Sequence, residues 1–132
     1  MKRKWRLHLM LIFIVILIAG CSNSAGADDL SLEPIQAVVT ISPQQLKTGQ
    51  LVTFQAKVTQ GSKVVDDADK VEFEIWEVQN VNNRVKVPAK HTKDGIYTLD
   101  KSFSKAGTYR VYAHVYAHDQ HTMPLTEFTI NP

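Results

Sequence analysis

Residues 35–132 predict an all-β domain, because apolar and polar residues alternate through several short stretches of this region. Turn-forming residues recur between these stretches, about every eight to twelve positions. A helical period of about 3.6 residues is not evident in any of them. About seven strands separated in this way are typical of an immunoglobulin-like β-sandwich. A small barrel is the alternative for so many short strands.

The expected strands follow one another closely along the chain. Residues 51–59 are a clear example, in which the even-numbered positions are apolar and are expected to face the core. Tyr109 follows a glycine turn at the start of the penultimate strand, where a tyrosine corner is expected to bond its hydroxyl to the preceding loop. The strands are expected at residues 35–41, 51–59, 71–76, 84–87, 96–103, 109–117 and 125–130.

Residues 1–20 have the features of a bacterial signal peptide. Four basic residues precede an apolar stretch at 7–18, and two small residues precede Cys21, the only cysteine. The sequence Ile18-Ala19-Gly20-Cys21 resembles a lipobox, so we expect cleavage before Cys21 and lipidation of its sulfur. An uncleaved membrane anchor is disfavoured, because the apolar stretch is short of the about 20 residues that span a bilayer.

The next segment, residues 21–34, is rich in Ser, Ala, Gly, Asn and Asp and is expected to be a flexible tether after the lipidated cysteine. The protein is therefore expected at the cell membrane, held by its lipid on the extracytoplasmic face. Removal of the signal takes four of the 15 Lys and Arg, which leaves 11 against 13 Asp and Glu, a formal charge of −2. This balance argues against a nucleic-acid partner.

Three of the five histidines and one methionine lie between residues 114 and 123. A hairpin centred between residues 119 and 120 would bring them to one side of a two-stranded ribbon, with opposed Cβ atoms about 5 Å apart. His114, His121 and Met123 are the expected ligands of one small ion. His118 is a competitor, because it lies about 13 Å from His114 along a straight strand.

Imidazole suits copper and zinc, and the thioether of methionine selects Cu(I). The alternative is that the histidines are simply solvent-exposed and that Met123 packs against Tyr116. An enzyme is not expected, because the chain has no Gly-rich phosphate loop, no G-x-S-x-G elbow and no cysteine left after lipidation. The acidic residues 66–69 lack the Gly and the closing Glu of an EF-hand loop and are expected to form a solvated turn.

Several short motifs resemble the YtkA-like domain family, from about residue 38 to residue 130. They are Phe73-Glu74-Ile75-Trp76, His91 ahead of Asp94-Gly95-Ile96-Tyr97, and the run His114-Val115-x-Ala117-x3-His121-x-Met123-Pro124. The family comprises secreted or lipid-anchored proteins of bacilli and their relatives. The resemblance implies an immunoglobulin-like sandwich and a part in copper handling at the cell surface. It also implies that His91, His114, His121 and Met123 occupy the family's histidine and methionine positions, whereas His118 does not match.

The sequence therefore predicts a membrane-anchored, extracytoplasmic copper carrier and not an enzyme. By resemblance, its partner is a copper acceptor, either the copper centre of a respiratory oxidase or another copper chaperone. The alternative is a metal-free interaction module that binds another envelope protein through a sheet edge or through the face of Tyr112 and Tyr116.

Overall fold

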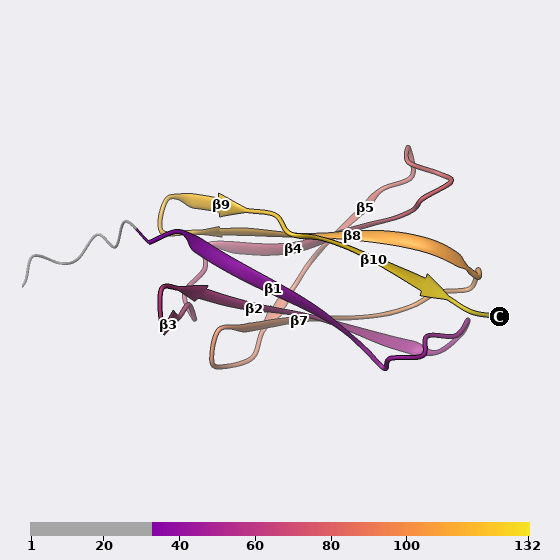
Figure 1. Cartoon of the computed structure of the whole chain (residues 1–132), viewed down its shortest axis with the longest axis horizontal. Coiled ribbons are helices and arrows are strands. Elements are labelled where there is room, and N and C mark those ends of the chain that lie inside the picture. Colours follow the sequence, from indigo (N-terminus) through magenta and orange to yellow (C-terminus); the bar gives the residue numbers. More distant parts are fainter. Residues whose placement is uncertain (1–32) are drawn as a thin grey trace, which may run out of the picture. The chain divides into compact units, whose positions relative to one another are not determined.

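The computed structural model describes residues 33–132, in which ten strands form two antiparallel sheets (Figure 1). The first sheet has the order β1 (Ile35–Ser42), β2 (Leu51–Gln60), β7 (Ile96–Ser102) and β6 (Lys90–His91), and β3 (Lys63–Val64) also pairs with β2. The second has the order β10 (Leu125–Ile130), β8 (Gly107–Ala117), β4 (Lys70–Glu77) and β5 (Val85–Pro88), and β9 (Gln120–Thr122) also pairs with β8.

Two separate sheets confirm the predicted all-β sandwich and exclude the barrel. Seven of the strands have four or more residues and correspond to the seven expected ones, whereas β3, β6 and β9 are shorter and were not predicted. No helix in the described residues is long and apolar enough to cross a membrane. The predicted signal peptide and Cys21 lie outside the described part of the chain.

The core lies between the two sheets. The even-numbered residues 52–58 of β2 are fully buried, as the alternation predicts, and they face the inward residues of β4 and β8. Phe54 stands at the centre, with its ring centroid 5.3 to 6.2 Å from those of three other phenylalanines. These three are Phe73, Phe103 and Phe128.

The predicted tyrosine corner is confirmed, and the turn before β7 requires a glycine. The hydroxyl of Tyr109 donates to the carbonyl of Lys105 at 2.9 Å, which is the tyrosine corner. The turn before β7 has Asp94 and Gly95 in the left-handed region, at φ 56° and 71°. A Cβ at Gly95 would lie 2.5 Å from the carbonyl oxygen of Val58, so only glycine fits there.

The hairpin between β8 and β9 differs from the prediction. His118 and Asp119 form its turn at φ 50° and 59°, and Tyr116 pairs with His121. The predicted turn centre, between Asp119 and Gln120, is therefore wrong by one residue. Two successive residues in the left-handed region make the type of tight turn that matches the twist of the two strands, and this outweighs the turn character of Asp119-Gln120.

Candidate metal site

The corrected register brings His114 and His121 together and places Met123 opposite His114. Strands β9 and β10 pair with β8 in one continuous register, which places Met123, in the gap between them, opposite His114. In the same register His121 is opposite Tyr116. Residues opposed in this way on neighbouring strands have Cβ atoms about 4.5 to 5.5 Å apart.

These side chains lie on the outward face of the second sheet. Alternate residues of β8, such as Ala113 and Val115, are fully buried in the core, so His114 points to the opposite face. His114 is nevertheless only 6% exposed, because neighbouring side chains on that face cover it. Met123 is 42% exposed at the edge of the same surface.

The two nitrogens of His114 have different neighbours. Nε2 lies 2.6 Å from Oε2 of Glu74 on the adjacent strand β4. Nδ1 lies 3.4 Å from Nε2 of His121, and the two imidazole planes are within 10° of parallel. Hydrogen bonds from N–H donors are most often about 2.9–3.0 Å long. The contact between the two histidines is therefore long for a hydrogen bond.

The ring of His121 is held by stacking. Its centroid lies 4.1 Å from that of Tyr116, and the two planes are 1° apart. The amine of Lys70 lies 5.1 Å from the centroid of Tyr116, on the other neighbouring strand. Aromatic stacking of this kind restricts the rotation of an exposed side chain, so Nε2 of His121 stays directed toward His114.

Glu74 is a site residue that sequence analysis did not identify. Its carboxylate binds His114 and also accepts a bond of 3.3 Å from Arg84, while the amine of Lys86 lies 3.9 Å away. Burial by itself would raise the pKa of Glu74, but the hydrogen bonds with His114 and Arg84 outweigh burial and lower that pKa. Its sequence signals were its place on the polar face of strand 71–76 and its presence in the motif Phe73-Glu74-Ile75-Trp76, and neither assigned it a role.

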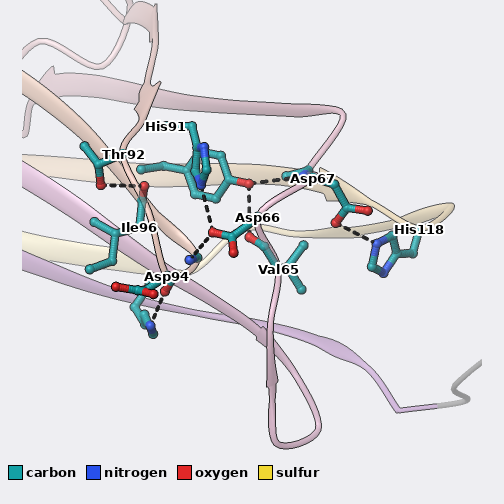
Figure 2. A network of polar contacts seen from close by, with 12 residues as sticks. Val65, Asp66, Asp67, His91, Thr92, Asp94, Ile96 and His118 are labelled. Atoms are coloured by element: carbon teal, nitrogen blue, oxygen red, sulfur yellow. Dashed lines mark hydrogen bonds and ion pairs between the residues drawn. The ribbon is translucent and has the colours of Figure 1, made fainter.

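His91 and His118 are placed elsewhere, around the acidic loop (residues 65–69) that precedes β4 (Figure 2). Asp66 points toward His91, with 2.9 Å between Oδ1 and Nε2, whereas Asp67 points toward His118, with 3.1 Å between Oδ1 and Nε2. His118 also lies 2.8 Å from Gln60 through Nδ1.

The acidic loop is thus more than a solvated turn. The amide of Gly95 donates to Asp66 at 2.6 Å, and the hydroxyl of Tyr97 donates to the carbonyl of Val65 at 3.0 Å. The hydrogen bond from Gly95, followed by that from His91, holds the pKa of Asp66 below its ordinary value. These contacts tie the loop to the first sheet and to the turn between β8 and β9.

In residues 33–132, no group of three or more His, Cys, Asp or Glu side chains is arranged to hold a metal ion. The candidate set therefore consists of two imidazoles with the thioether of Met123. Such a set is suited to a soft metal ion and not to the oxygen-preferring Ca²⁺ or Mg²⁺.

A family model described as YtkA-like matches residues 30–114. The chain belongs to the YtkA-like family. The match extends from before β1 into β8 and includes His91 and His114, but it ends before His121 and Met123. Its bounds differ from the resemblance read in the sequence, which ran to about residue 130. No curated protein matches this YtkA-like chain.

Several solved structures share the sandwich arrangement with this YtkA-like protein. The soluble domain of PmoD from Methylocystis sp. ATCC 49242 (Rockwell) is 11% identical, and the match covers 76% of this chain and 93% of that one, with a TM-score of 0.49. CopC from Methylosinus trichosporium OB3b is 22% identical, with coverages of 74% and 95% and a TM-score of 0.49. A computer-redesigned β-sandwich protein is 13% identical, with coverages of 76% and 96% and a TM-score of 0.47. Likenesses at this level carry no information on function.

Proposed function

We propose that this YtkA-like protein binds copper through His114, His121 and Met123 and carries it outside the cytoplasm. The observation that supports this most directly is the 3.4 Å separation between Nδ1 of His114 and Nε2 of His121. Imidazole nitrogens lie about 2.0–2.1 Å from a bound ion such as zinc, so two of them on one tetrahedral ion are about 3.3–3.4 Å apart. The spacing therefore suits two ligands of one ion better than a hydrogen bond.

The third donor favours copper over zinc. Met123 lies opposite His114 in the strand register, and a thioether is a ligand that selects Cu(I). Zinc prefers thiolate, imidazole and carboxylate ligands. Since the sole cysteine is the expected lipidation site, the site would rely on imidazole and thioether alone.

The exposure of the site suits a carrier. Met123 and the neighbouring Leu125 are 42% and 48% exposed, so an acceptor protein can approach the ion from this side. Three protein ligands leave one tetrahedral position for an incoming ligand of the acceptor. With Cys21 lipidated and residues 21–34 as a tether, the donor site would stay close to the extracytoplasmic face of the cell membrane. By family resemblance, the acceptor would be the copper centre of a respiratory oxidase or another copper chaperone.

The test is a copper titration of residues 22–132 against a competing chelator, under reducing and under oxidising conditions. We expect one copper ion per chain. His121→Ala should weaken its affinity by at least about 100-fold, because loss of an outer-shell partner alone costs about 10- to 100-fold. His91→Ala and His118→Ala are matched controls, because both histidines are engaged with Asp66 and Asp67 instead.

Copper binding that is no weaker in His121→Ala than in the two controls would contradict the proposed ligands. Absence of stoichiometric binding in the unchanged protein would contradict a copper carrier. The metal-free interaction module would then be the better description, with the exposed Met123 and Leu125 as part of its contact surface.

A further inference from the structure

Glu74 and His114 form the shortest contact in the site, 2.6 Å between Oε2 and Nε2. An ionised carboxylate only accepts hydrogen bonds, whereas a neutral imidazole has one nitrogen that donates and one that accepts. The contact therefore requires the proton of His114 to be on Nε2. Charge-assisted N–H···O bonds are about 2.7–2.9 Å long, and this contact is slightly shorter, at 2.6 Å.

The same contact determines the state of the other nitrogen. If Nε2 of a neutral His114 carries the proton, Nδ1 has a free lone pair, and this lone pair faces Nε2 of His121 at 3.4 Å. His114 is only 6% exposed, so the surrounding side chains oppose a ring flip that would exchange Nδ1 and Nε2. The bare nitrogen is thus directed at the position where the metal would bind.

Glu74 is itself fixed in place. Arg84 donates to its other oxygen, Oε1, at 3.3 Å, and the guanidinium of Arg84 lies 4.2 Å from the centroid of Trp76. The carboxylate therefore has a cation and a histidine on its two oxygens. Metal-binding histidines commonly have such a carboxylate on the nitrogen that does not bind the metal.

We infer that Glu74 is the positioning residue of this site: its carboxylate holds the proton of His114 on Nε2 and presents Nδ1 to copper. The part that concerns copper rests on the proposed function. The part that concerns the proton applies to the metal-free protein and can be tested separately. Glu74 does not touch the ion in this arrangement.

The first experiment is NMR of the metal-free full chain in detergent micelles with ¹⁵N-labelled histidine, near neutral pH. We expect Nε2 of His114 to carry a proton that is hydrogen-bonded to Glu74 and protected from exchange. In Glu74→Ala the protected Nε2–H signal of His114 should disappear. An Nε2 of His114 that carries no proton in the unchanged chain, or one whose proton exchanges as fast in the unchanged chain as in Glu74→Ala, would overturn the inference.

The second experiment is copper affinity by chelator competition on the same chains. Glu74→Ala should weaken binding by about 10- to 100-fold, as loss of a histidine-orienting carboxylate does elsewhere. Glu72→Ala is the matched control: Glu72 pairs with His114 in the strand register and is similarly covered, but its carboxylate lies 3.0 Å from Lys70 instead. Equal affinities of the two variants would overturn the positioning role.

If Glu74→Ala does not fold, Glu74→Gln and Glu72→Gln replace the pair, and the larger loss is expected for Glu74→Gln. An equal loss in these two would overturn the role. The two proposals fail in distinguishable ways. A chain that binds no copper but keeps the Nε2 proton contradicts only the copper function, whereas a chain that binds copper regardless of Glu74 contradicts only the positioning role.

Discussion

His114 is the only polar or charged residue that is buried among residues 33–132. A buried polar side chain needs hydrogen-bond partners, and Glu74 supplies one at 2.6 Å. An apolar residue would fill this position on β8 without needing a carboxylate. The pair of Glu74 and His114 is therefore better explained by a function on the outward face of the sheet than by a contribution to the stability of the fold.

At the same scale, Met123 should determine the choice of metal. Met123→Leu keeps a side chain of similar volume at an exposed position, so the fold should be unaffected. We expect its affinity for Cu(I) to fall by about tenfold or more, which corresponds to about 1.4 kcal/mol, because the thioether is lost. Its affinity for Zn(II) should not change, because only the two imidazoles would hold that ion.

Parallel titrations with both metals check this prediction. Thermal unfolding of the metal-free variant serves as the control for the fold. If Met123→Leu lowers the affinities for Zn(II) and Cu(I) equally, or lowers neither, Met123 is not a ligand that discriminates between the two metals.

At the scale of elements, the acidic loop fastens β4 to the first sheet and to the hairpin that carries His121. Asp66 accepts from the amide of Gly95 and contacts His91, while Asp67 contacts His118 in the hairpin turn. The loop thus connects the turn between β8 and β9 to the other sheet. His91 and His118, which the sequence grouped with the metal ligands, are therefore partners of this loop instead.

The loop should make stability depend on pH in the acid range. The pKa of Asp66 is held below its ordinary value by the Gly95 amide and by His91. A carboxyl group with a lowered pKa in the folded state stabilises the protein above its ordinary pKa, about 3.9, and this contribution is lost as pH falls through the lowered value. Asp66→Asn should therefore lose less of its free energy of unfolding than the unchanged protein between about pH 5 and pH 2.

Urea unfolding at several pH values measures this difference. Asp69→Asn is the control, since it removes the same charge from the same loop, and its side chain has no hydrogen bond or ion pair within the described residues. The account of Asp66 is incorrect if Asp66→Asn and Asp69→Asn depend on pH in the same way.

Much of the fold could be predicted from the sequence, because the alternation of apolar and polar residues in a strand is a local signal. The buried even-numbered positions 52–58 and the tyrosine corner at Tyr109 follow from residues close in the chain. The partners of His114 could not be predicted, because they depend on which strand lies beside β8. The hairpin register depended on two residues adopting the left-handed region, which His and Asp do less often than Asn and Gly.

At the scale of the whole molecule, the core and the candidate site are separate. The buried hydrophobic residues of the described part lie between the sheets, whereas His121 and Met123 lie on the outer face of one sheet. Substitutions in these two ligands should therefore leave the sandwich folded. Copper binding should raise the unfolding temperature of the unchanged chain, because a ligand that binds only the folded state stabilises it.

X-ray absorption on copper-loaded residues 22–132 tests the central claim most directly. Met123 is the only sulfur-containing residue in this part of the sequence, so any copper–sulfur scattering must come from it. We predict two imidazole nitrogens and one sulfur around Cu(I), and loss of the sulfur contribution in Met123→Leu. A copper environment without sulfur, or one that keeps both imidazoles in His121→Ala, would contradict the site described above.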